Sequence, residues 1–146
     1  MPTLRIAEPD DDARLADWRH VHNVTVPPAA LSLDEVRERV RRNRLAVAYL
    51  GDVLVGCTTV RPPADGSTTA TVIARVLPGH RGRGFGEELY TRSLKRARAL
   101  GAETIETVVL AANEPGLRFA RQHGFVEIER YVLPGESAEW VDLRLR

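Results

Sequence analysis

Hydrophobic residues recur along the chain with two periods, and the period separates predicted helices from predicted strands. Spacing near 3.6 residues predicts four helices, which span residues 10–26, 32–43, 84–100 and 113–124. Runs rich in Val, Ile, Leu and Thr predict seven strands, at residues 4–7, 45–50, 53–60, 68–77, 104–110, 125–133 and 137–145. The predicted element order is therefore β-α-α-β-β-β-α-β-α-β-β.

Capping and turn residues support these boundaries. Ser32 and Glu35 form a capping box at the start of the second helix, and Gly101 follows the end of the long third helix. Gly51-Asp52 is typical of a tight hairpin between two strands. Because no repeat, low-complexity tract or linker interrupts the chain, we predict one domain of the α/β (α+β) class over residues 1–146.

Composition and charge exclude several classes of protein. The chain is 43% hydrophobic and 28% charged, which is typical of a globular domain. Its 21 basic and 20 acidic residues leave a formal charge of +1, so no nucleic-acid partner is expected. The second helix carries a basic run that is interpreted as a solvated helix face: Arg37, Arg39, Arg41, Arg42 and Arg44.

No apolar run approaches the roughly 20 residues that a membrane helix needs, and the first residues lack an apolar signal core. We therefore expect a cytoplasmic protein without a membrane partner. Cys57 is the one cysteine, which excludes an internal disulfide, and with four scattered histidines it gives no metal-ligand spacing. No metal site is predicted, and Cys57 is interpreted as a buried small hydrophobe.

The segment Arg81-Gly82-Arg83-Gly84-Phe85-Gly86 lies between a predicted strand and the long third helix. Glycines let the backbone turn tightly, and the free N–H groups at a helix N-terminus bind phosphate. Arg81 and Arg83 would add charge-assisted contacts. A Walker loop is excluded because no Gly-Lys-Ser/Thr follows, and Glu87 stands where a dinucleotide fingerprint needs glycine or alanine. The pattern predicts a phosphate or pyrophosphate site; a plain connecting turn is the alternative.

Residues 76–86 resemble the acetyl-CoA motif of the GNAT superfamily of N-acetyltransferases, Arg/Gln-x-x-Gly-x-Gly/Ala. Asn113 and the stretch from Phe119 to Gly124-Phe125 resemble a downstream segment of the same family, and the element order matches its fold over nearly the whole chain. The resemblance implies a mixed, mostly antiparallel sheet flanked by helices and splayed between the fourth and fifth strands. It also implies direct transfer of an acetyl group from acetyl-CoA to a primary amine of a small molecule or peptide.

The resemblance further implies which residues hold the cofactor. Main-chain groups of the fourth strand would pair with the pantetheine arm, the amides from Gly82 to Glu87 would hold the pyrophosphate, and Asn113 would contact the arm. The cofactor-binding residues implied in this way are Ala74, Arg75, Val76, Arg81, Gly82, Arg83, Gly84, Phe85, Gly86, Glu87 and Asn113.

The chain departs from the family at its acid and base. Ala120 stands where many members carry a tyrosine that protonates the leaving thiolate, Val108 stands where some carry a glutamate base, and another carboxylate position falls near Ala70. Proximity and orientation contribute roughly 7–11 kcal/mol to such a reaction, so direct transfer stays the prediction. A catalytically weak acyl-CoA-binding or sensing module is the alternative, and transfer of a longer acyl group is a further one.

Two residues are candidates for the missing acid and base. Glu106 shares a strand face with Val108 and is the candidate base, with a solvated carboxylate as the alternative. Tyr131 is the candidate acid, with a core aromatic as the alternative. His80 and His123 flank turns and are expected to be exposed.

The acceptor is expected to lie against the first two helices and the last two strands. Trp18, His22 and the loop at residues 26–28 favour an apolar or aromatic pocket, with His22 packed there or lining it. We therefore expect a small amine, an amino acid or an antibiotic as acceptor in preference to a lysine-rich protein tail. The sequence leaves a homodimer open.

Overall fold

The computed structural model describes residues 3–146, so residues 1 and 2 of the predicted domain lie outside the described residues. The helices are α1 (Asp12–Thr25), α2 (Leu33–Arg42), α3 (Phe85–Ala99) and α4 (Glu114–Gln122). The strands are β1 (Arg5–Ala7), β2 (Arg44–Leu50), β3 (Val53–Arg61), β4 (Thr69–Val76), β5 (Thr104–Leu110), β6 (Phe125–Val132) and β7 (Glu139–Leu145). This order is the predicted one. Two short 3₁₀ turns, Pro27–Ala29 and Pro78–His80, were not predicted.

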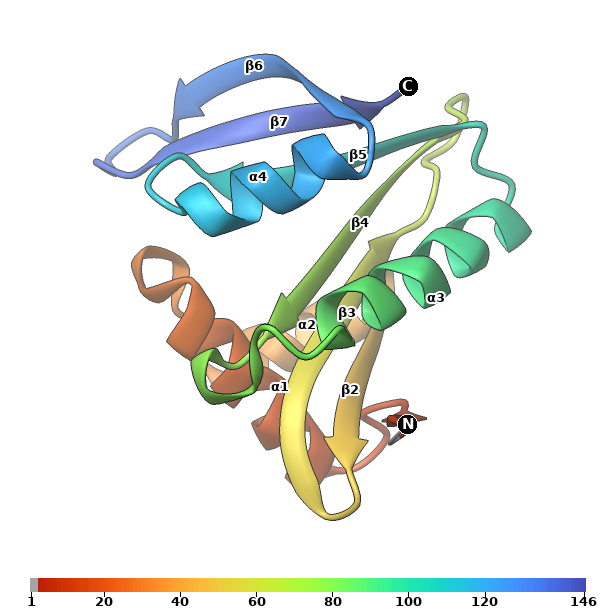
Figure 1. The fold of residues 1–146 in the computed structure, drawn as a ribbon, viewed down its shortest axis with the longest axis vertical. Coiled ribbons are helices and arrows are strands. Elements are labelled where there is room, and N and C mark those ends of the chain that lie inside the picture. The colour runs from red at the N-terminus through yellow and green to blue at the C-terminus, as the bar shows by residue number, and fades with distance from the viewer. Residues whose placement is uncertain (1–2) are drawn as a thin grey trace.

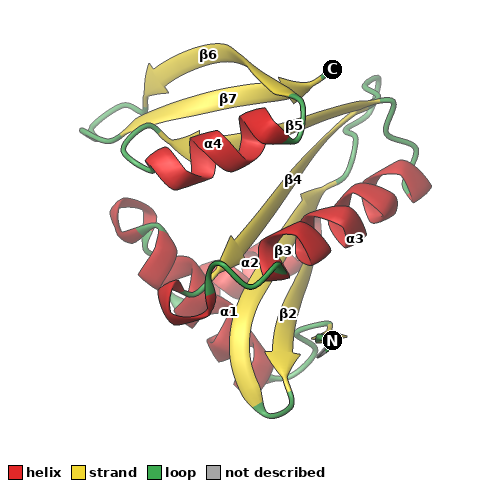
Figure 2. Cartoon of the chain, viewed as in Figure 1, coloured by secondary structure: helices red, strands yellow, loops and turns green. Residues whose placement is uncertain are grey.

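The seven strands form one mixed sheet in the order β1-β2-β3-β4-β5-β7-β6. Neighbouring strands are antiparallel except β4 and β5, which are parallel. The sheet separates α3 and α4, on one face, from α1 and α2 on the other (Figures 1 and 2). The predicted α/β (α+β) class with a mostly antiparallel sheet is thus confirmed.

The cores on the two faces are built from alternate residues of the same strands. Cys57 on β3 packs with Trp18 of α1 and Val36 of α2. Val76 on β4 packs on the opposite face, with Phe85 and other residues of α3. Within residues 3–146, no helix is long and apolar enough to cross a membrane.

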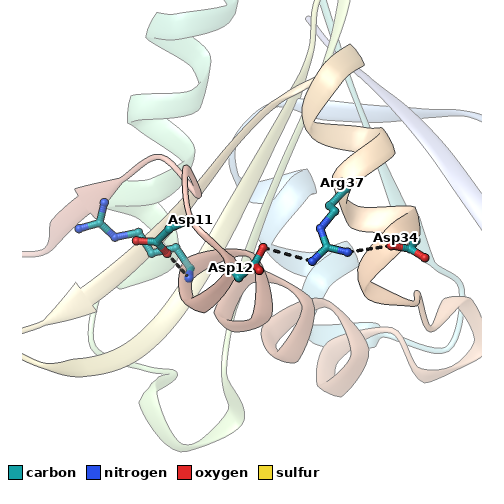
Figure 3. A network of polar contacts seen from close by, with 5 residues as sticks. Asp11, Asp12, Asp34 and Arg37 are labelled. Carbon is teal, nitrogen blue, oxygen red and sulfur yellow. Dashed lines mark hydrogen bonds and ion pairs between the residues drawn. The ribbon is translucent and has the colours of Figure 1, made fainter.

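Local signals fix where the first two helices begin. The Asp11 side chain accepts a hydrogen bond from the Arg14 N–H and starts α1, and the predicted capping box starts α2. Arg37 links the two helices, because its guanidinium contacts Asp12 at 3.2 Å and Asp34 at 2.7 Å (Figure 3). These exposed ion pairs contribute at most about 1 kcal/mol each, so helix packing rests on the apolar core.

The sheet opens between β4 and β5. The two strands pair only where Thr69–Thr71 meets Thr104–Glu106. Beyond that point they diverge, as Figure 1 shows, while β4 continues along β3 and β5 continues along β7. The implied splay between the fourth and fifth strands is confirmed, and it leaves one edge of β4 without a partner strand.

Candidate functional site

A cavity of about 410 Å³ lies in the opening between β4 and β5. Its walls come from residues 72–76 of β4, residues 107–110 of β5, the start of α3, several residues of α4, and Thr25 and Val26 at the end of α1. Since α1 and α3 cover opposite faces of the sheet, residues from both faces line the cavity.

The loop between β4 and α3 presents a row of free backbone amides. Gly82 and Gly84 have φ angles of +76° and +83°, a region that favours glycine. In the described part of the chain, the amides of residues 82–87 donate to no backbone carbonyl; the first helical bond runs from the Glu88 N–H to the Gly84 carbonyl at 3.2 Å. A Cβ placed on Gly82 or Gly84 would meet no atom within 4 Å. This open space beside free amides fits a pyrophosphate.

The two arginines of the loop differ in their surroundings. Arg81 lines the cavity, and its Nε donates to the Val76 carbonyl at 3.1 Å, so it ties the loop to the end of β4. The Arg83 guanidinium lies over the Phe85 ring, 4.9 Å from its centroid. Arg83 is the one implied cofactor residue that does not line the cavity.

The register of β4 decides which of its main-chain groups face the opening. The Leu77 N–H donates to Val55 on β3 at 2.9 Å. Alternate residues of a strand direct their peptide groups to opposite neighbours. Ala74 and Val76 therefore face the opening, whereas the main chain of Arg75 faces β3. A main-chain cofactor contact at Arg75 does not fit this register, although Arg75 lines the cavity.

Asn113 has both a structural role and a free donor. Its Oδ1 accepts the Gly116 N–H at 3.1 Å and caps the start of α4. Asn113 also lines the cavity. Because the oxygen is used by the cap, the carboxamide nitrogen is the atom left to contact a cofactor arm.

The α4 wall of the cavity contains no replacement for the family's tyrosine. Ala120 and Val108 both line the cavity, so both positions face the space for ligands but offer no proton. The expected exposure of His80 and His123 is wrong, since both are half-buried and line the cavity. The His123 ring stacks on Phe119 at 4.1 Å and bonds its carbonyl at 2.9 Å, which holds the imidazole against α4.

Neither predicted catalytic residue lines the cavity. The Glu106 carboxylate forms an ion pair with Arg144 at 2.6 Å. The Tyr131 hydroxyl donates to Asp142 at 2.8 Å, and burial together with this carboxylate raises the pKa of Tyr131 to about 12. Asp142 lies directly across from Val108 in the β5–β7 register. Sequence reasoning missed Asp142, because only strand order places it beside Val108.

Of the residues expected at the acceptor pocket, Val26 lines the cavity, whereas Trp18 and His22 lie in the core. Trp18 is 1% exposed, and its indole N–H donates to the Thr58 carbonyl. His22 stacks on Trp18, bonds the Ala29 carbonyl, and is buried, which lowers its pKa to about 4. His22 is therefore a packed, neutral histidine. Cys57 is buried as predicted, and burial raises the pKa of its thiol to about 12.

Comparison with known proteins identifies the family. The sequence profile of the acetyltransferase (GNAT) family matches residues 11–125. A comparison with curated proteins finds no match. A solved structure of a predicted phosphinothricin N-acetyltransferase aligns with a TM-score of 0.80 and 19% identity over 98% of both chains.

Two further solved structures share the fold. A predicted acetyltransferase from Salmonella typhimurium, solved with its cofactor acetyl-CoA, aligns with a TM-score of 0.76 and 20% identity over 98% of this chain and 93% of that one. The ribosomal-protein-S18-alanine N-acetyltransferase from Escherichia coli aligns with a TM-score of 0.77 and 15% identity over 98% and 93%. Since the family profile spans most of the chain and the fold agrees with it, the chain belongs to the acetyltransferase (GNAT) family and is an acetyltransferase.

Proposed function

We propose that the protein transfers the acetyl group of acetyl-CoA directly to the primary amine of a small molecule. The observation that carries this proposal is the cavity through the sheet, which begins at a row of free amides and reaches the end of α1 on the other face. The acyl donor is acetyl-CoA, and when bound it supplies the thioester carbonyl. The amine would approach from the face of α1 and α2.

The residues of the chain bind and orient the donor. The amides of residues 82–87 hold the pyrophosphate at the start of α3, where the helix dipole favours negative charge. Ala74 and Val76 offer main-chain groups to the pantetheine arm along the free edge of β4, and the Asn113 carboxamide nitrogen offers a donor from the other wall. Arg81 and the packed residue Phe85 keep this loop in place.

Few side chains at the site could donate or accept a proton during the transfer. Free thiols titrate near 8.5, so the CoA thiolate is an acceptable leaving group without an acid at the position of Ala120. The proton that the amine loses as the amide forms would pass to water or to this thiolate. The Tyr131 proton is directed to Asp142, so its oxygen offers lone pairs that would accept an N–H from the amine. Although Tyr131 does not line the cavity, we retain it as a residue that would orient an amine approaching from the side of α1 and α2. Glu106, in its ion pair with Arg144, is left out of the mechanism.

A small acceptor fits the site better than a basic protein tail. The carboxylates of Glu106 and Asp142 are both engaged in contacts with neighbouring side chains, and the cavity wall near α1 is formed by Thr25 and Val26. The similar solved structures include one named for a small molecule and one named for a ribosomal protein. The small acceptor, the cytoplasmic location and a homodimer remain predictions.

Thiol release measured with a panel of primary amines tests the proposed transfer. Cys57 is buried, so a thiol reagent added to the folded protein reports CoA alone. We expect release that depends on the amine, a loss of kcat/KM in Tyr131→Phe, and a change of less than twofold in Glu106→Gln. Tight CoA binding without thiol release for any amine would instead support the sensing module, which the Ala120 and Val108 positions favour. Octanoyl-CoA in the same assay tests a longer acyl group.

A further inference from the structure

Two half-buried arginines on the acceptor side of the sheet have no anionic partner among the described residues, and one of them, Arg75, lines the cavity. Of residues 3–146, the half-buried arginines are Arg14, Arg39 and Arg75. Arg14 forms an ion pair with Asp10 at 3.2 Å. Arg39 and Arg75 form no ion pair or side-chain hydrogen bond in this part of the chain. Arg39 was predicted to lie on a solvated face; the structure turns it inward.

These two arginines lie on the same side of the sheet, and Arg61 lies there too. Arg75 pairs with Cys57, whose side chain packs under α1 and α2. Arg61 is four residues further along β3, so its side chain projects from the same face. Arg39 comes from α2, which covers that face. Three guanidinium groups from three elements thus gather on the acceptor side.

The guanidinium groups are close enough to repel one another. Burial lowers the pKa of Arg75, and the charges of Arg61 and Arg39 lower it further. Burial lowers the pKa of His22, and the charges of Arg75, Arg39 and Arg61 lower it further. His22 is therefore neutral and adds no positive charge to this group. Positive charge held partly out of water and without an anion is unfavourable, so the site is arranged for an anion that the chain itself does not provide.

The group formed by Arg39, Arg61 and Arg75 lies on the opposite face of the sheet from the amides expected to bind the cofactor's phosphates. Arg75 lines the cavity, but its side chain projects toward α1 and α2, whereas the free amides of residues 82–87 lie at α3 on the opposite face. Across the opening, the Tyr131–Asp142 pair occupies the neighbouring half of the sheet. Asp142 influences the pKa of Arg61 but lies beyond ion-pair distance.

We propose that Arg75, with Arg39 and Arg61 beside it, binds an oxyanion carried by the acceptor. The acceptor is then a small amine that also bears a carboxylate or a phosphorus oxyacid, as an amino acid or an aminophosphonate does. The anion would contact the arginines, and the amine would extend toward Tyr131 and the thioester. This inference rests on the proposed acetyl transfer, and it names the class of acceptor.

Pairs of acceptors that differ only in the anion test the inference. Each α-amino acid is compared with its methyl ester or its decarboxylated amine, and 2-aminoethylphosphonate is compared with ethylamine, by CoA thiol release. We expect kcat/KM to be at least about tenfold higher for the anion-bearing member, the effect of one charge-assisted hydrogen bond. Equal or better use of the neutral members would overturn the inference while leaving acetyl transfer intact.

Single substitutions test whether Arg75 is responsible for the preference for anion-bearing acceptors. Arg75→Met should raise the KM for anion-bearing acceptors about tenfold or more, with a smaller effect on kcat, and Arg61→Gln, at an exposed position, should raise it less. Arg37→Met is the matched control, because Arg37 lies on the outer side of α2 in contact with Asp12 and Asp34. If the KM for anion-bearing acceptors is the same in Arg75→Met, in Arg61→Gln and in the control Arg37→Met, the inference is wrong.

Binding distinguishes failure of this inference from failure of the proposed function. If no amine releases thiol, the proposed transfer fails, and the anion site is then decided by thermal unfolding of the CoA-loaded protein. Millimolar amino acids or aminophosphonates should raise the Tm of the parent protein and of Arg37→Met, but not of Arg75→Met. A Tm unchanged by every such compound in the parent protein would overturn the anion site.

Discussion

Replacement of Gly84 by alanine tests the phosphate role of the loop. Gly84 has a φ angle of +83°, and a Cβ added there would meet no atom within 4 Å. The substitution therefore costs only the strain of a left-handed residue, about 1–2 kcal/mol. For a domain of this size, each kcal/mol lowers Tm by about 2–4 °C. We expect a folded variant whose Tm is about 2–8 °C lower.

The larger effect should appear in CoA binding. The added methyl group would occupy the open space in front of the free amides of residues 82–87. A lost hydrogen bond to a charged group costs about 1.5–3 kcal/mol, so the Kd for CoA should rise about tenfold or more. At a CoA concentration 100 times the parent Kd, binding stabilises the parent by about 2.7 kcal/mol and the variant by about 1.4 kcal/mol or less.

Gly66→Ala is the matched control. Gly66 has a φ angle of +78°, also has no atom within 4 Å of an added Cβ, and does not line the cavity. Thermal unfolding with and without CoA, and calorimetric titration of CoA, are measured for both variants. Both should lose similar stability, and only Gly84→Ala should lose affinity. If Gly84→Ala binds CoA within twofold of Gly66→Ala, the amides of this loop do not hold the pyrophosphate.

Because the folded pKa of His22 is about 4 and the unfolded value is 6.5, the unfolded chain binds more protons between these values. Stability should thus fall by up to about 3 kcal/mol as pH drops from 6.5 to 4, and urea unfolding of His22→Phe should show a smaller loss. Asn113→Asp should keep the α4 cap but raise the CoA Kd, measured by calorimetry. Because the acceptor amine must lose its proton before it attacks, kcat/KM should rise from pH 6 to 9. Since the pKa of Tyr131 is raised to about 12, no falling limb is expected in this range, and a bell-shaped profile would reveal another acid. Cys57 should react with a thiol reagent only after denaturant unfolds the protein.

Features that depend on residues close together in the chain were predictable from the sequence. The capping box at Ser32 and Glu35, the Gly101 helix end and the glycine-rich loop before α3 all occur in the structure as expected. These features involve hydrogen bonds and dihedral angles within a few residues of chain. The apolar periods gave the element order for the same reason, since each period is set by local geometry.

Only the tertiary structure decided what faces the acceptor. Periodicity shows which residues of a strand share a face, but not which neighbour that face meets. The strand order sets Asp142 beside Val108, and the packing of α2 on the sheet brings Arg39 to the side of Arg75. Burial and repulsion at Arg75 depend on groups from distant parts of the chain. Charge and solvation act through space, so the acceptor site could not be predicted from local sequence.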